Sequence, residues 1–104
     1  MGDKIRYPVG RGWWPLADEA VERLGQMNVR VRAVYEKYGT LRLDVEPEPN
    51  KATDILLEIE EHSAHVCERC GRPGNEVENS QGWVKTLCRE CAAEWRQNPL
   101  SIRP

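Results

Sequence analysis

Apolar residues recur every three or four positions along the segment that follows Trp14. Pro15 suits the first turn of a helix, and Gly25 suits a helix end. The apolar positions of the segment are Leu16, Ala17, Ala20, Val21, Leu24 and Met27. This spacing predicts an amphipathic helix over residues 15–26.

The next segment alternates between apolar and polar residues with a period of two, which is the period of a β-strand. Residues 37–40 (Lys-Tyr-Gly-Thr) form a turn between two such runs, so we predict a β-hairpin. One face of the hairpin would carry Val29, Val31, Ala33, Tyr35, Leu41, Leu43 and Val45. The other face would carry Arg30, Arg32, Arg42, Asp44 and Glu46.

A second helix is predicted at about residues 52–65, after the strand-breaking residues 47–50 (Pro-Glu-Pro-Asn). Asn50 or Thr53 would cap it. Its apolar stripe consists of Ala52, Ile55, Leu56 and Ile59, extended by Ser63 and Val66. The helix leads into Cys67 without a linker, so we expect this region and the remainder of the chain to share a core.

Composition and charge narrow the function classes. The chain has 104 residues, the size of one domain or of one domain with a small appendage, and its net charge is -2. Residues 1–66 hold 9 basic and 12 acidic residues, and residues 67–104 hold 6 and 5. Neither part is a basic nucleic-acid-binding module. There is no apolar run of membrane-spanning length and no apolar signal core, so we expect a cytoplasmic protein without membrane association.

Four cysteines form two Cys-x-x-Cys pairs, Cys67 with Cys70 and Cys88 with Cys91, separated by seventeen residues. In a reducing compartment this pattern indicates a metal site, and four thiolates suit tetrahedral zinc. Four ligands would leave no open coordination position. We therefore predict one structural Zn²⁺ rather than a catalytic metal, and no enzyme activity or small-molecule substrate.

Other interpretations of these residues remain open. The cysteines would instead form two disulfides if the protein is secreted, remain free thiols, or act as a redox pair. His62 or His65 would replace one cysteine as a ligand, although favourable placement at a helix C-terminus also explains them. Trp83 and Trp95 are expected to pack beside the cysteine pairs and shield them from water.

The residues around the cysteines predict the local fold. Residues 83–87 are typical of a strand that enters the second pair, and residues 89–97 are good helix sequence stopped by residues 98 and 99 (Asn-Pro). A ligand pair in the first turn of a helix is the arrangement of treble-clef fingers. The predicted fold class is therefore α+β: a helix–hairpin–helix region over residues 1–66 continues into a treble-clef or zinc-ribbon-like module over residues 67–104.

The sequence resembles two groups of known proteins. The cysteine spacing, with Trp83 and the pair Leu87-Cys88, resembles GATA-type fingers, which read DNA with the finger helix and a basic tail. After Cys91, however, only Arg96 and Arg103 are basic. Residues 12–91 also resemble small bacterial and phage proteins of uncharacterised function, in their Gly-Trp-x-Pro-Leu, Tyr-Glu-Lys-Tyr-Gly-x-Leu-Arg, Cys-x-x-Cys-Gly-x-Pro-Gly and Gly-Trp-x-Lys-Thr-Leu-Cys segments. This second resemblance implies a small cytoplasmic protein and brings no activity with it.

Partner binding is the leading functional expectation: an adaptor, inhibitor or immunity-type factor that docks on another protein. The candidate contact residues are Trp13, Trp14, Glu36, Lys37, Tyr38 and Arg42. Each has a structural alternative, because tryptophans often pack over a core and charged residues beside a turn often pair across strands. Nucleic-acid binding is the second expectation, and it would use Arg30, Arg32, Arg42, Lys85 and Arg89.

Overall fold

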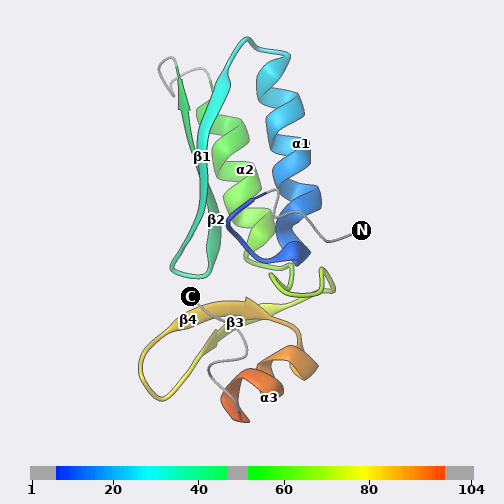
Figure 1. Ribbon diagram of the computed structural model, residues 1–104, viewed down its shortest axis with the longest axis vertical. Helices are drawn as coiled ribbons and strands as arrows, with labels where there is room; N and C mark the ends of the chain where they lie inside the picture. The colour runs from blue at the N-terminus through cyan, green and yellow to red at the C-terminus, as the bar shows by residue number, and fades with distance from the viewer. Residues whose placement is uncertain (1–6, 47–51, 98–104) are drawn as a thin grey trace.

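The computed structural model describes residues 7–46 and 52–97, which form a mixed α+β structure with three α-helices and two small antiparallel sheets (Figure 1). In chain order the elements are η1 (Arg11–Trp13), α1 (Trp14–Gly25), β1 (Arg30–Lys37), β2 (Thr40–Glu46), α2 (Thr53–Ser63), β3 (Asn75–Glu78), β4 (Val84–Leu87) and α3 (Arg89–Gln97). The α+β class predicted from the sequence is confirmed at this level. Within the described ranges, no helix is both long and apolar enough to cross a bilayer.

Helix α1 begins one residue before the predicted start and ends one residue before the predicted end. Pro15 lies in its first turn, where a missing backbone N–H costs nothing. The buried face consists of Leu16, Ala17, Ala20 and Leu24. Val21 and Met27, which the sequence pattern also placed on this face, are only partly covered, with 40% and 37% of their surfaces exposed.

The β1–β2 hairpin forms as predicted, with Tyr38 and Gly39 as its two central turn residues. Both have positive φ, 53° and 77°, which is the conformation of the hairpin turn that matches strand twist. Along β1, Val31 pairs with Val45 and Ala33 with Asp44, which leaves Arg32 as one extra residue in the strand.

This β-bulge makes part of the predicted apolar face wrong. An extra residue reverses the side-chain alternation beyond it. Val34 therefore faces the core, whereas Ala33 and Tyr35, which the simple alternation placed there, are exposed. Before the bulge the prediction holds, because Val29 is buried and Val31 packs against the core.

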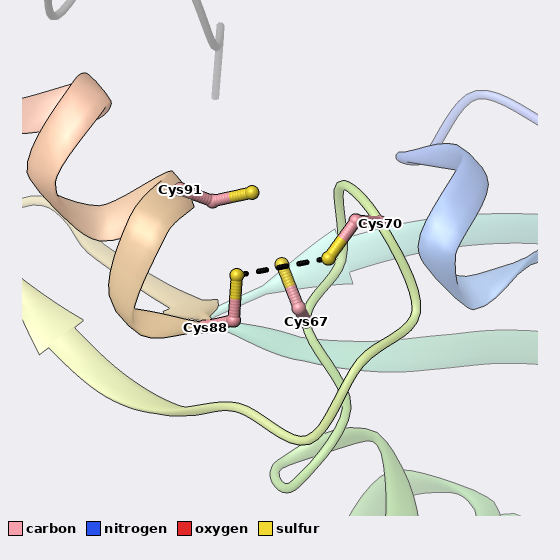
Figure 2. A group of neighbouring side chains, drawn as sticks. All are labelled: Cys67, Cys70, Cys88 and Cys91. Carbon is pink, nitrogen blue, oxygen red and sulfur yellow. Dashed lines mark hydrogen bonds between the residues drawn. The ribbon is translucent and has the colours of Figure 1, made fainter.

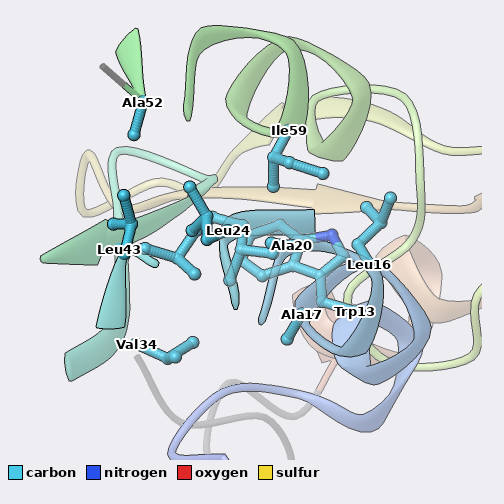
Figure 3. Packing of buried hydrophobic residues seen from close by; sticks show 11 residues of the cluster. Trp13, Leu16, Ala17, Ala20, Leu24, Val34, Leu43, Ala52 and Ile59 are labelled. Carbon is cyan, nitrogen blue, oxygen red and sulfur yellow. The ribbon is translucent and has the colours of Figure 1, made fainter. Parts of the chain in front are cut away.

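Helices α1 and α2 cover one face of this hairpin, and the space between them holds the larger apolar core (Figure 3). The predicted second helix is confirmed, although it begins after Ala52 and ends at Ser63. Asn50 lies outside the described residues, and the residue at the N-cap, Ala52, makes no capping side-chain bond. The core residues are Trp13, Leu16, Ala17, Ala20, Leu24, Val29, Val34, Leu41, Leu43, Ala52 and Ile59.

The part of the chain after residue 66 holds β3, β4 and α3 below the first unit in Figure 1. Strands β3 and β4 pair antiparallel from Asn75 opposite Leu87 to Glu78 opposite Val84. A second buried cluster forms here from Cys67, Leu87, Cys88, Ala92 and Trp95. Two of its five members are cysteines, so this cluster contains little aliphatic surface with which to hold itself together.

Candidate metal centre

Four cysteine sulfurs from two distant parts of the chain meet at one point. The ligand atoms of Cys67, Cys70, Cys88 and Cys91 all lie within 4.8 Å of one another (Figure 2). Cys67 and Cys70 lie in the loop after α2, Cys88 lies between β4 and α3, and Cys91 lies in the first turn of α3. The four side chains form one cluster that could coordinate a metal ion.

The first cysteine pair lies in a tight backbone turn. The Gly71 N–H donates to the Cys67 carbonyl at 2.9 Å, and the Cys67 N–H donates to the Arg72 carbonyl at 2.7 Å. Gly71 has a φ of +85°, a conformation that residues with a Cβ rarely adopt. This turn brings the sulfurs of Cys67 and Cys70 to the same side of the loop.

The second pair uses the start of α3. The Ala92 N–H donates to the Cys88 carbonyl at 2.8 Å, which closes the first helical turn across the ligand pair. The backbone N–H of Cys91 donates to the Cys88 sulfur and, as the largest cause, lowers the pKa of that thiol to about 7. A helix N-terminus stabilises negative charge, so this position favours a thiolate ligand.

The separations fit a tetrahedral metal. Four sulfurs at about 2.3 Å from a central zinc ion would lie about 3.8 Å apart. The sulfurs of Cys70 and Cys88 lie 3.6 Å apart, and all four fall within the 4.8 Å limit. Desolvation within the cluster raises the pKa of the Cys70 and Cys91 thiols, so these two groups favour the protonated form unless a bound cation stabilises the thiolates. Thiolates as a donor set suit soft metals.

The cluster is covered unevenly. Cys67 and Cys88 are buried, Cys91 is half-buried and Cys70 is exposed. Trp95 packs against this cluster with 2% of its surface exposed, as the sequence predicted. The same prediction is wrong for Trp83, which is 52% exposed, because it lies at the distal end of the β3–β4 hairpin rather than beside the sulfurs.

Two ion pairs join the first cysteine loop to α3 across the site. Arg69 lies 2.8 Å from Glu94, and Arg72 lies 3.4 Å from Glu90. Both pairs are solvent-exposed, so water and salt screen them and each adds little stability. The pairs help to orient the first cysteine loop relative to α3, but they are too weak to hold the two segments together by themselves.

A buried ion pair lies directly behind the first cysteine loop. Glu68, between Cys67 and Cys70 in sequence, is 4% exposed, and Lys85 of β4 is 1% exposed. The Lys85 Nζ lies 3.2 Å from one Glu68 carboxylate oxygen, and the Thr86 N–H donates to the other at 3.4 Å. Desolvation raises the pKa of Glu68, and Lys85 opposes that shift. The pair fixes the cysteine loop to β4.

The N-terminal segment packs on the same loop. The Gly12 N–H donates to the Glu68 carbonyl at 2.9 Å, and the Trp13 indole N–H donates to the Val66 carbonyl at 2.8 Å. A Cβ on Gly12 would lie 2.0 Å from the Cys67 carbonyl oxygen. No local sequence signal indicates these contacts, since they join residues more than fifty positions apart.

The predicted partner residues do not form one surface. Trp13 is fully buried in the core, as expected of a tryptophan that packs over a core, so a partner cannot contact it in this conformation. Trp14 is half-buried, and its indole N–H donates to the Val9 carbonyl at 3.0 Å. Arg42 is half-buried and lies 3.3 Å from Glu60 of α2.

The remaining three lie together at the hairpin tip. The Lys37 Nζ lies 5.6 Å from the centre of the Tyr38 ring, and a Glu36 carboxylate oxygen accepts the Gly39 N–H at 3.0 Å. Tyr38 is 73% exposed. In the described part of the chain, the group that could hold a metal ion consists of the four cysteines, and His62 and His65 lie outside it.

Comparison with known proteins adds no assignment: the chain matches no protein-family profile, no curated protein and no solved structure.

Proposed function

We propose that the four cysteines hold one structural zinc ion in a treble-clef arrangement. The order of elements supports this, since a cysteine turn, a β-hairpin and a helix that begins at the second cysteine pair follow one another from Cys67 to Gln97. Zinc is the common ion for four closed thiolates. A full shell leaves no site for substrate, so the ion would stabilise the fold rather than act on a reactant.

The function that best fits this framework is a non-enzymatic protein–protein interaction factor of bacterial or phage origin, of the adaptor, inhibitor or immunity type. The observation that carries the proposal is the exposure of two large aromatic residues, Tyr38 and Trp83, on adjoining parts of a small zinc-stabilised structure. Exposed aromatic residues on a rigid support are typical anchors of protein interfaces.

Nucleic-acid binding is supported less well by the arrangement of basic residues. Lys85 is buried against Glu68, Arg30 and Arg32 pair with Glu46, and Arg42 pairs with Glu60. Arg89 is the one candidate of the five for which the described residues supply no ion pair, and one arginine makes too few phosphate contacts for strong binding.

The metal part of the proposal is tested by elemental analysis of protein purified under reducing conditions. We expect one zinc per chain, lost in a variant with Cys88→Ser and Cys91→Ser. A preparation that folds with no stoichiometric metal, or that holds an iron–sulfur cluster, would contradict structural zinc.

The interaction part is tested by affinity purification from the native host, followed by titration of the purified partner against the zinc-loaded protein. We expect a stoichiometric complex with a defined protein. Failure to bind any protein, together with a salt-dependent mobility shift of DNA or RNA, would replace this function with the nucleic-acid alternative.

A further inference from the structure

A cleft of about 390 Å³ opens where the tips of the two hairpins meet. It is lined by Glu36, Tyr38, Gly82, Trp83, Val84 and Lys85. One wall belongs to the β1–β2 turn and the other to the segment entering β4. This volume is at the small end of ligand sites, with room for one long side chain rather than a large cofactor.

Direct contacts hold the two walls of the cleft together. The Thr86 hydroxyl donates to the Gly39 carbonyl at 2.6 Å, and both groups are buried. A Cβ on Gly39 would lie 3.1 Å from the Val84 side chain, so the turn rests closely on β4. The backbone segments that hold Tyr38 and Trp83 therefore pack directly against each other, so these contacts fix the shape of the cleft.

The identity of the turn residue is not explained by the turn itself. Tyr38 has a φ of 53°, and this left-handed conformation favours glycine, asparagine or aspartate. A tyrosine there is strained relative to those residues. Its ring is 73% exposed, so burial in the described structure does not offset that strain. A ligand that covers the ring would do so.

The charges around the cleft select the ligand. The Lys85 ammonium group pairs with Glu68 at 3.2 Å, and the Lys37 ammonium group lies over the Tyr38 ring, so the carboxylates of Glu36 and Glu68 face these two cations. A third carboxylate, Glu78, lies beside Gly82 at the rim. Lys37 already lies over the Tyr38 ring, which shows that this ring face accepts a cation. An anionic ligand would meet carboxylates here.

We propose that this cleft binds a cationic side chain, arginine or lysine, of the protein partner, held between the Tyr38 and Trp83 rings with its charge toward Glu36. Aromatic faces attract cations, and a nearby carboxylate adds a charge-assisted hydrogen bond. This inference rests on the proposed interaction function and names the chemistry of the partner residue that enters the site.

The test uses the full-length zinc-loaded protein and short blocked peptides that differ at one central residue: arginine, lysine, citrulline or glutamate. The indole N–H signal of Trp83 in a two-dimensional ¹H–¹⁵N spectrum, assigned by its absence in Trp83→Phe, reports binding. We expect saturable shifts with the arginine and lysine peptides and affinity at least about fivefold weaker for citrulline.

Variants assign the binding to the cleft. Tyr38→Asn removes the ring while supplying a residue that suits the turn, so it should fold and bind the arginine peptide about fivefold more weakly. Glu36→Gln keeps the acceptor for the Gly39 N–H and should abolish the preference for arginine over citrulline. Leu57→Ala, at an exposed apolar position on α2, is the control and should leave binding unchanged.

The outcomes separate this inference from the proposed function. Equal shifts with citrulline or glutamate, no shift with the basic peptides, or shifts with single-stranded oligonucleotides alone would overturn the cationic site. If a protein partner binds equally well to wild type and to Tyr38→Asn, the interaction function stands and the cleft assignment fails. If basic peptides bind here but no protein partner is found, the cleft stands and the interaction function fails.

Discussion

The backbone N–H of Gly12 donates to the carbonyl of Glu68 at 2.9 Å, which brings the N-terminal segment against the first cysteine turn. The two segments approach so closely that a Cβ on Gly12 would lie 2.6 Å from the Gly71 nitrogen as well as 2.0 Å from the Cys67 oxygen. All these obstructing atoms are backbone, so a side chain here cannot be accommodated by a rotamer change. A displacement of the segment that leads into the first helix would therefore also displace the cysteine turn.

Gly12→Ala should destabilise the protein by about 2–3 kcal/mol, because the added methyl group forces two backbone segments apart. We also expect weaker metal binding, since the displaced segment contains Cys67. The measurement is urea denaturation of the zinc-loaded protein together with competition for zinc against a chromophoric chelator.

Gly25→Ala is the matched control. Its Cβ would meet nothing within 4 Å, and it lies at the end of α1, so alanine should be neutral or stabilise by up to about 1 kcal/mol. If the two variants have equal stability, Gly12 does not make the close approach described above.

The elements themselves could be predicted from the sequence because their signals are local. The period of the apolar positions and the residues Pro15 and Gly25 placed α1 to within one residue at each end. The bulge at Arg32 could not be predicted in this way, since one unpaired residue leaves the alternating composition unchanged and only reverses which side faces the core. Ala33 and Tyr35 were misplaced for that reason.

Trp95 and Trp83 should respond very differently to truncation. Trp95→Ala removes a buried ring from the cluster beside the cysteines and should cost about 3–5 kcal/mol. Trp83→Ala removes an exposed ring and should cost less than about 1 kcal/mol. Thermal or chemical unfolding of both variants in the zinc-loaded state checks this, and a larger loss for Trp83 would contradict its observed exposure.

The buried Glu68–Lys85 pair predicts a strong effect of breaking it. Lys85→Met leaves the Glu68 carboxylate uncompensated in a dry site and should destabilise by about 3–5 kcal/mol at neutral pH. The double variant with Glu68→Gln should recover much of that loss. A double variant as unstable as the single one would show that the uncompensated Glu68 carboxylate is not the cause of the loss.

The pH dependence of Lys85→Met follows from the sign of the Glu68 shift. Burial raises the pKa of Glu68, so the folded state holds its proton more tightly than the unfolded state does. The contribution of Glu68 to stability is then most favourable below the ordinary carboxyl pKa of 4.5 and is lost as the pH rises through the folded value. The deficit of Lys85→Met relative to wild type should shrink as the pH is lowered from neutrality. Glu68→Gln should remove this dependence.

The candidate metal site was the most predictable part of the chain, because two Cys-x-x-Cys pairs specify both the ligands and their local turns. What lies around it was not predictable. Lys85 was counted among basic residues for nucleic acid, yet it pairs with Glu68 seventeen positions away. Trp83 and Trp95 both lie close to a cysteine pair in the sequence, so the sequence gives no reason to treat them differently. Their burial differs because Trp83 lies at the far end of the β3–β4 hairpin, whereas Trp95 lies in α3 against the cysteine cluster. Such pairings depend on tertiary contacts that no local pattern encodes.

Removal of the metal should unfold the two buried clusters to different extents. The cluster around Cys67, Cys88 and Trp95 contains little aliphatic surface, so without an ion only a small apolar contact and the ion pairs around it hold the two cysteine segments together. The larger cluster around Trp13 is formed by residues no later than Ile59 and does not include a cysteine.

A strong chelator under reducing conditions should therefore abolish amide-exchange protection in β3, β4 and α3. It should leave α1, α2 and the β1–β2 hairpin protected but weakened, because the Gly12 and Trp13 bonds to the cysteine turn are lost. Readdition of zinc should restore protection in both regions. Undiminished protection of α3 in the chelated protein would show that the cysteine cluster does not need an ion to fold.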